Sequence, residues 1–148
     1  MSRMAHQPPA DEEIITTFGR LLEASSTLER RLGRSLEAEC GIPLPWFEVL
    51  LRLSRADDGQ LSMGALAEQV ALTTGGITRL LDRMIKEGLV ERRPCPTDRR
   101  VSFAGLTPAG RDKVEQAASV HARDLREVFA RYSTDEHHTF DCLLDRLR

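Results

Sequence analysis

Apolar residues recur at helical spacing over the first part of the chain. Between Asp11 and Cys40 they fall three, four or seven positions apart, the pattern of a helix with one buried face. The stripe consists of Ile14, Phe18, Leu21, Leu28, Leu32 and Leu36. Gly41 and the prolines that follow it end this helix near Cys40. The segment 45–54 is almost entirely apolar and predicts a second, largely buried helix.

The pattern then changes to two shorter helices. Ser62 provides a cap for the first of them, and Thr73 or Thr74 caps the second, which ends at Gly88. The second helix has a predicted buried face of Ile77, Leu80, Leu81, Met84 and Ile85. Its other side is polar and carries several arginines, so this side is expected to face solvent or a partner.

Two short strands follow this pair of helices. The segments 89–93 and 100–106 have the composition of strands, and the residues between them are rich in turn formers and positive charge. We therefore predict a β-hairpin with a cationic tip.

The last part of the chain returns to helical spacing. Thr107 and Pro108 start a long helix that we expect to reach Tyr132. Residues 133–136 form a capping box, which opens a final helix. We expect that helix to be buried through Phe140, Leu143, Leu144 and Leu147.

Length and composition indicate one globular domain. The chain has 148 residues, of which 41% are hydrophobic and 30% charged. Residues 1–10 have little to bury and are expected to form a flexible tail before a single domain over 11–148. No apolar run approaches the length of a membrane span, so we expect a cytoplasmic protein without a membrane partner. The three cysteines are scattered, odd in number and expected to be reduced thiols.

Charge is distributed unevenly along a chain whose formal net charge is only −2. Between Arg79 and Arg100 there are seven basic residues and four acidic ones. Helix, short break, helix and a hairpin with an arginine-rich tip form the layout of a winged helix-turn-helix, whose second helix enters the major groove of DNA.

Five successive motifs make a resemblance specific. They are Ala65-Leu66-Ala67-Glu68, Ile77-Thr78-Arg79-Leu80-Leu81-Asp82-Arg83-Met84, Glu87-Gly88-Leu89-Val90-Glu91-Arg92, Pro96-Thr97-Asp98-Arg99-Arg100 and Leu106-Thr107-Pro108-Ala109-Gly110. In this order the chain resembles the MarR family of bacterial transcriptional regulators. The resemblance implies a mainly α fold with a small β-hairpin wing, in which 61–107 form the winged helix-turn-helix and 11–60 with 108–148 form a helical dimerisation region. It also implies a homodimeric repressor that binds a palindromic operator and is released by a small molecule.

Position within this layout assigns the DNA-binding residues. Thr73 and Thr74 stand at the positive end of the recognition helix and can donate to a phosphate or a base edge. Gly75 and Gly76 depart from the small polar residues of many relatives, and close approach of the backbone to DNA would explain them. Base reading is then expected from Thr78 and Arg79, with support from Arg83. At the hairpin tip Asp98 is expected to pair with an arginine, leaving Arg99 or Arg100 for the minor groove; the sequence does not say which.

The resemblance also implies a ligand site between the dimer helices and the winged module. The corresponding positions in this chain are Phe18, Leu22, Trp46, Phe47 and Leu50. An aromatic or phenolic effector, expected to be anionic, would bind there, with the Trp46 indole as a contact. The alternative is that Trp46 and Phe47 simply belong to the core.

Other functions remain open at this point. The domain could be a protein-interaction module that docks through Trp46 and Phe47. It could also be a redox sensor through Cys40 or Cys95, although Cys40 has no adjoining basic cluster. His138 and Cys142, with His137 or Asp141, give a weak metal-site pattern. No catalytic motif is present, and we predict neither an enzyme, a cofactor nor a metal site.

Overall fold

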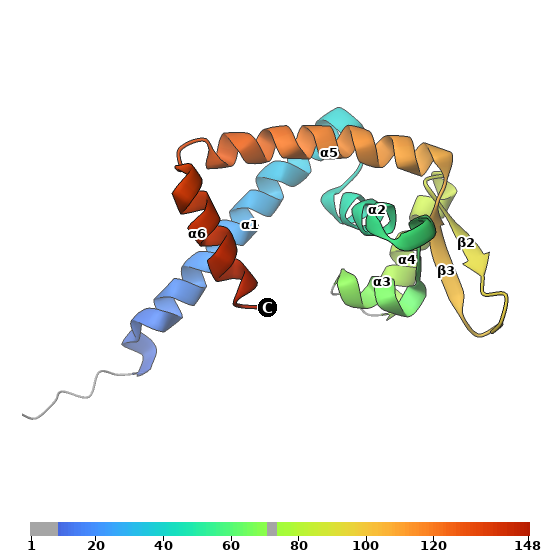
Figure 1. Cartoon of the computed structure of the whole chain (residues 1–148), viewed down its shortest axis with the longest axis horizontal. Coiled ribbons are helices and arrows are strands. Elements are labelled where there is room, and N and C mark those ends of the chain that lie inside the picture. Colours follow the sequence, from blue (N-terminus) through green and yellow to red (C-terminus); the bar gives the residue numbers. More distant parts are fainter. Residues whose placement is uncertain (1–8, 71–73) are drawn as a thin grey trace, which may run out of the picture.

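The computed structural model describes residues 9–70 and 74–148. Its six α helices surround or extend from a small sheet, and the molecule is long rather than round (Figure 1). The helices are α1 (Glu13–Cys40), α2 (Leu44–Arg55), α3 (Met63–Gln69), α4 (Thr74–Lys86), α5 (Pro108–Phe129) and α6 (Thr134–Asp145), and the strands are β1 (Gln60–Ser62), β2 (Val90–Pro94) and β3 (Ser102–Leu106). The mainly α fold with a small β wing is confirmed.

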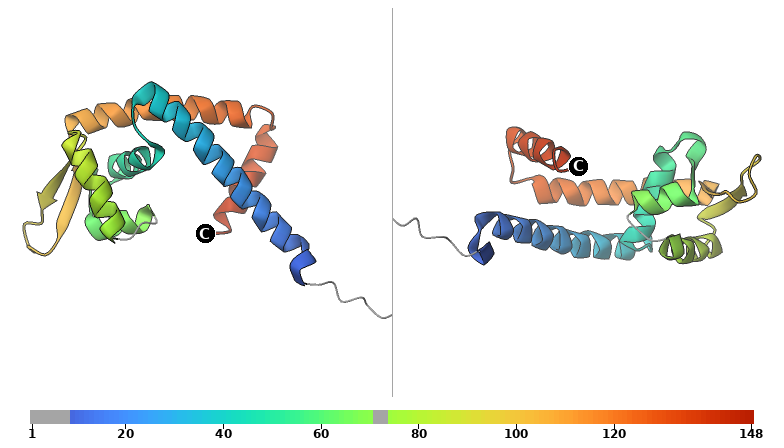
Figure 2. Two further views of the ribbon diagram at one scale, coloured as in Figure 1. Left: turned by 180° about the vertical axis from the view of Figure 1, so that it is seen from behind. Right: turned by 90° about the horizontal axis from the view of Figure 1, so that it is seen from below.

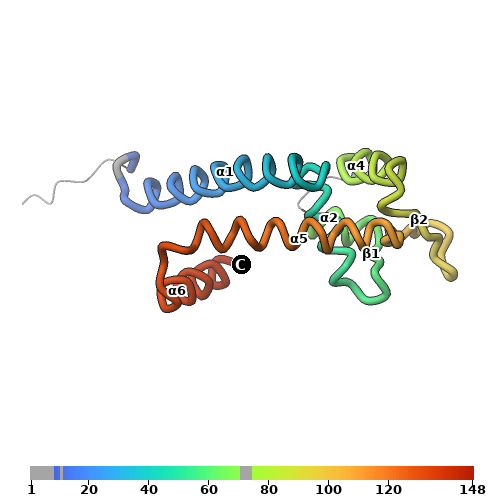
Figure 3. The backbone as a smooth tube through the Cα atoms, turned by 90° about the horizontal axis from the view of Figure 1, so that it is seen from above, coloured from blue at the N-terminus to red at the C-terminus, as the bar shows by residue number. Residues whose placement is uncertain are grey.

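The two long helices, α1 and α5, form the backbone of the molecule. They run side by side when the chain is seen from above or below (Figures 2 and 3). Gly41 ends α1 with a φ of 68° while its N–H donates to the Glu37 carbonyl, as expected of a glycine at this position. Only the C-terminal part of α1 is buried, however: Leu36 is 0% exposed, whereas Phe18 is 60% exposed.

Helices α3 and α4 begin and end at the signals seen in the sequence. The Ser62 hydroxyl accepts a hydrogen bond from the Ala65 N–H and caps α3. On α4 the predicted face is buried, with Ile77, Leu81 and Met84 fully inaccessible. Gly88, at a φ of 74°, lets the chain turn from α4 into β2.

The sheet has one strand more than the predicted hairpin. β1 pairs antiparallel with β3, with Leu61 opposite Ala104, so the strand order is β1-β3-β2. Three residues beside a helix cap carry no strand period, so the sequence pattern does not predict this strand. The hairpin is also shorter than predicted at β3, because Val101 N–H donates to the Asp98 carbonyl and belongs to the turn.

One core joins the winged module to the long helices. Its members come from α1, α2, α3, α4, α5 and the sheet, and those with no exposed surface are Leu36, Leu50, Leu53, Leu66, Ile77, Leu81, Met84 and Ala117. Helix α2 therefore lies in the centre of the winged module, and it contacts α5 and β3 as well as α1.

The C-terminal helices form a separate arm at the far end of α5 (Figure 1). The capping box is confirmed, since Ser133 Oγ accepts from the Glu136 N–H and Glu136 accepts from the Ser133 N–H. α5 ends at Phe129, short of the predicted Tyr132, where the Tyr132 N–H donates to the Phe129 carbonyl in a turn.

The predicted burial of α6 is wrong for a single chain. Phe140 is 44% exposed, Leu143 51% and Leu147 74%, while Leu144 is half-buried. The reason is geometric: α6 folds back beyond the end of the core and meets it only through Phe129, whose ring lies 6.1 Å from that of Phe140. The apolar face of α6 is left uncovered, like the N-terminal half of α1.

Two sequence predictions fall on the chain ends. Of the predicted tail 1–10, residues 1–8 lie outside the described residues, and Pro9–Asp11 form a short 3₁₀ turn. Within the described ranges, no helix combines the length and the apolar character that crossing a membrane requires.

Candidate nucleic-acid interface

The exposed side of α4 carries the predicted base-reading residues. Arg79 and Arg83 are four residues apart and share one face of the helix; Arg83 is exposed, as Asp82 beside it is. Thr78 is half-buried. A Cβ added at Gly75 would meet nothing nearer than the Arg79 guanidinium, 3.9 Å away, so the first turn of this face is open. Gly76 is half-buried at the same end.

Two predicted residues at the start of α4 cannot be placed. Thr73 lies outside the described residues, and of Thr74 the structure describes only the backbone, which begins the helix. The roles proposed for their hydroxyl groups stay predictions.

The wing tip resolves which arginine pairs with Asp98. The Asp98 carboxylate accepts from the Arg100 backbone N–H at 2.9 Å and from its guanidinium at 3.2 and 3.3 Å. These bonds lower the pKa of Asp98 and hold it ionised. The Arg100 side chain nevertheless remains 91% exposed, so the pair orients it without burying it. Arg99 is exposed and has no ion pair within the described residues.

Two arginines of the cationic segment brace the wing instead of facing outward. Arg92 on β2 pairs with Asp82 on α4 at 2.8 Å and ties the wing to the recognition helix. Arg93 pairs with Glu91 and donates to the Leu106 carbonyl, and its guanidinium lies directly over Gly105. The local charge count includes both arginines, because a pairing such as that with Asp82 spans ten residues and leaves no signal in the sequence. Among the described residues, Arg79, Arg83, Lys86 and Arg99 are the members of this segment without an ion pair.

The five predicted ligand residues are not gathered at one site. Leu50 is 0% exposed and Phe47 2%, Trp46 is half-buried against the core, and Phe18 and Leu22 lie on the exposed half of α1. The burial of Phe47 also removes it from a docking surface, so the interaction-module alternative is not favoured.

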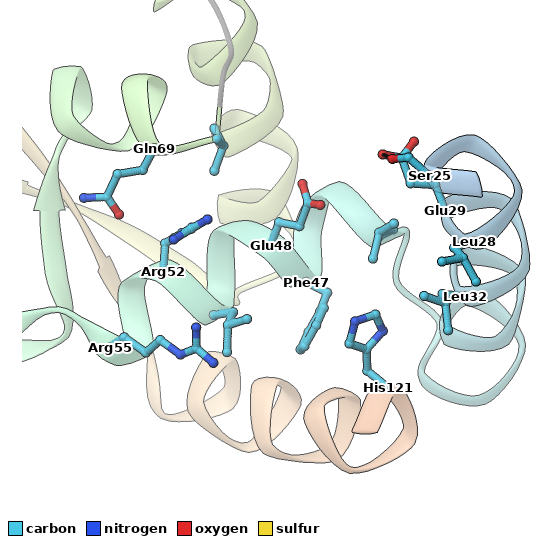
Figure 4. A pocket seen from close by; sticks show the side chains of 13 residues that line it. Ser25, Leu28, Glu29, Leu32, Phe47, Glu48, Arg52, Arg55, Gln69 and His121 are labelled. Carbon is cyan, nitrogen blue, oxygen red and sulfur yellow. Dashed lines mark hydrogen bonds between the residues drawn. The ribbon is translucent and has the colours of Figure 1, made fainter. Parts of the chain in front are cut away.

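A pocket of about 470 Å³ does lie between α1, α2, α3 and α5 (Figure 4). Of the five predicted residues only Phe47 lines it. The wall opposite is His121, whose ring centre lies 4.9 Å from that of Phe47. Burial lowers the pKa of His121 and keeps its ring neutral, although the charge of Asp124 acts in the opposite direction.

The cysteines differ in the property that controls their reactivity. Burial raises the pKa of Cys40, whereas hydrogen bonds from Thr97 and from backbone N–H groups lower the pKa of half-exposed Cys95. Near the C-terminus Cys142 Sγ lies 3.7 Å from His138 Nε2, and within the described part of the chain no group of three metal-binding side chains is formed.

We expect Cys95 to be alkylated by iodoacetamide faster than Cys40 in the folded protein, because it is both more accessible and more often a thiolate. Mass spectrometry of timed samples measures both rates, and Cys95→Ser should leave only the slow reaction of Cys40 beside that of exposed Cys142. Equal rates at Cys40 and Cys95 would contradict the structure.

Comparisons with known proteins agree with this geometry. A family model described as the MarR family matches residues 41–101. The multiple antibiotic resistance protein MarR of Salmonella typhimurium is 30% identical over 134 residues, which cover 90% of this chain and 92% of that protein.

Two solved structures of similar fold contain DNA. A MarR family transcriptional regulator from Streptomyces coelicolor, in complex with DNA, superimposes with a TM-score of 0.84 at 26% identity and covers 96% of this chain and 89% of its own. A mutant of MarR from Escherichia coli, complexed with operator DNA, gives 0.79 at 30% identity and covers 90% and 94%. This chain belongs to the MarR family of transcriptional regulators.

Proposed function

We propose that this protein represses transcription by binding a palindromic operator as a homodimer, with α4 in the major groove and the wing tip in the minor groove. The observation that carries the proposal is the set of arginines without an ion pair on these two elements, among the residues that the structure describes. Arg79 and Arg83 share the open face of α4, and Arg99 stands beside the oriented Arg100 at the tip. Similar structures in complex with DNA support the same orientation.

The proposed dimer uses the apolar surface that the single chain leaves open. Ile14 and Phe18 on α1 are 69% and 60% exposed, and α6 exposes Phe140 and Leu143. Large exposed apolar residues gathered on two helices mark an interaction surface. Because α2 lies in the core of the winged module, we assign dimerisation to the N-terminal part of α1, the end of α5 and α6 rather than to all of 11–60 and 108–148.

The two kinds of arginine should respond differently to substitution. Arg79→Ala is expected to lower affinity by about 1 to 3 kcal/mol and to relax preference at one base position, because a guanidinium can read guanine in the major groove. Arg99→Ala should weaken binding to all sequences alike and lower the salt slope by about one for each phosphate that its side chain neutralises. The measurement is fluorescence anisotropy with duplexes from the DNA upstream of the gene, titrated at several salt concentrations.

Arg34→Ala is the matched control, since it removes the same charge from α1, far from both DNA-contacting elements. An unchanged salt slope in Arg99→Ala, or an unchanged base preference in Arg79→Ala, would contradict the assigned roles. Failure of the unmodified protein to bind any duplex from its own upstream region would contradict the function itself.

A small aromatic molecule is proposed to regulate the complex from the pocket between α1, α2, α3 and α5. The pocket touches α1 through Leu28 and Leu32 and the winged module through Phe47 and Val70. A ligand bound there can favour one spacing of the module relative to the long helices over another, and it shifts DNA affinity by that difference.

A further inference from the structure

The pocket of Figure 4 has an aromatic and aliphatic floor of suitable size for a small ligand. Its volume is about 470 Å³, and its lining includes Leu28, Leu32 and Leu44 beside the Phe47 and His121 rings. Cavities of this size and lining bind small, largely apolar molecules and fix their orientation with a few polar groups. The charge of those polar groups therefore decides which ligands are accepted.

Two carboxylates from different helices line this pocket. Glu29 comes from α1 and Glu48 from α2, and both are seen beside the ring floor in Figure 4. Neither forms an ion pair within the described residues; the Glu29 carboxylate accepts a 3.5 Å hydrogen bond from Ser25.

The two carboxylates act on each other. Partial removal from water and the negative charge of Glu29 raise the pKa of Glu48, and Arg52 opposes this only in part. A positive charge placed near both groups would be attracted by each and would relieve their repulsion.

The basic side chains that line the pocket do not lie at its ring end. His121 is neutral there because burial lowers its pKa. Arg52 and Arg55 lie on the other side of α2, towards Gln69 (Figure 4). An anion stacked on Phe47 would meet the two carboxylates first, so the anionic effector expected from the sequence does not suit this pocket.

We propose that the pocket binds an aromatic amine in its cationic form, with the ring against Phe47 and His121 and the ammonium near Glu29 and Glu48. The inference names the ligand class of the effector site and rests on the proposed function only for the effect on DNA. Occupancy joins α1 to α2 through the two carboxylates, which are not joined to each other in the structure.

The test compares three probes that share a phenyl ring and differ in charge: phenethylamine, 2-phenylethanol and 3-phenylpropionate. Calorimetry at neutral pH is expected to show that the amine binds at least about tenfold more tightly than either of the others, as a charge beside unpaired carboxylates should. Glu48→Gln and Glu29→Gln should each reduce amine affinity several-fold and leave the alcohol unchanged. Glu37→Gln, an exposed carboxylate on α1 that does not line the pocket, is the control and should change neither.

Preference for the propionate, abolished in Arg52→Gln, would show an anion site and overturn the proposal. Equal binding of the three probes, or binding of none, would overturn it as well. Operator binding by the ligand-free protein is measured separately. If that binding is intact and the amine does not bind, this inference alone fails; if the ligand-free protein does not bind DNA, the proposed function fails whatever the amine does.

Discussion

Replacing Gly110 by alanine is expected to destabilise the protein by more than about 3 kcal/mol, at the upper end of what overpacking costs. A Cβ added at this position would lie 1.9 Å from the Leu89 carbonyl oxygen and 2.9 Å from the Leu89 carbonyl carbon. Both atoms belong to the backbone, so no side-chain rotation can make room.

The surrounding hydrogen bonds leave little freedom to shift α5 away. The Leu89 carbonyl accepts from the Thr107 N–H, and the Thr107 hydroxyl donates to the Gly88 carbonyl at 2.6 Å while it caps α5 through the Gly110 N–H. Moving the first turn of α5 breaks this cap and separates the helix from the start of β2. Tertiary contact rather than backbone conformation therefore requires glycine here.

Thermal unfolding at a fixed protein concentration measures the effect, which should lower the melting temperature by roughly 10 °C or more. Gly64→Ala is the matched control, because an added Cβ on α3 meets no heavy atom within 4 Å. That variant should be unchanged or more stable by up to about 1 kcal/mol, the helix preference of alanine over glycine. A melting temperature for Gly110→Ala equal to that of the unmodified protein would contradict the packing at Leu89.

Phe140→Glu is expected to dissociate the proposed dimer while each chain stays folded. α6 buries no residue in the single chain, and Phe140 is 44% exposed, so the fold does not depend on this side chain. An unpaired carboxylate in an apolar interface costs at least about 2 kcal/mol, and a two-fold interface contains each substitution twice. The dimerisation constant should then fall by roughly a thousandfold, since about 1.4 kcal/mol corresponds to a factor of ten.

Sedimentation at micromolar concentration measures the assembly, and operator affinity should fall with it because one chain engages only one half-site. His138→Glu is the control: it places the same charge on α6 two residues away, on the opposite side of the helix. If Phe140→Glu remains dimeric, α6 is not part of the interface; if it unfolds by circular dichroism, α6 contributes to the fold of the single chain.

The ends of the helices were predictable because each depends on atoms within a few residues. Ser62, Thr107 and Ser133 accept hydrogen bonds from N–H groups three residues further on, and Gly41 and Gly88 adopt the positive φ that ends a helix. The winged layout followed from these boundaries. The same locality explains why the buried face of α4 could be predicted, with Ile77 and Leu81 inside and the polar residues on the other side.

The features that the sequence did not predict depend on partners distant in the chain. β1 exists because Leu61 pairs with Ala104. The sequence left Arg99 and Arg100 as equal candidates to pair with Asp98, and the geometry of the turn chose Arg100. The pocket-lining pair Glu29 and Glu48 comes from two helices, and neither residue stands out in the pattern.

The sequence alone determined the helices, their caps, the cationic hairpin and hence the family, because periodicity and capping are properties of a few neighbouring residues. Only the tertiary structure decided which charges are used internally, which apolar stripes stay open and which side chains share a pocket. Arg92 and Arg79 look alike in the sequence, yet one is paired with Asp82 and the other has no ion pair among the described residues. The apolar residues of α6 continue a helical pattern like those of α4, yet they remain exposed, because burial depends on where a helix is carried and not on its own periodicity.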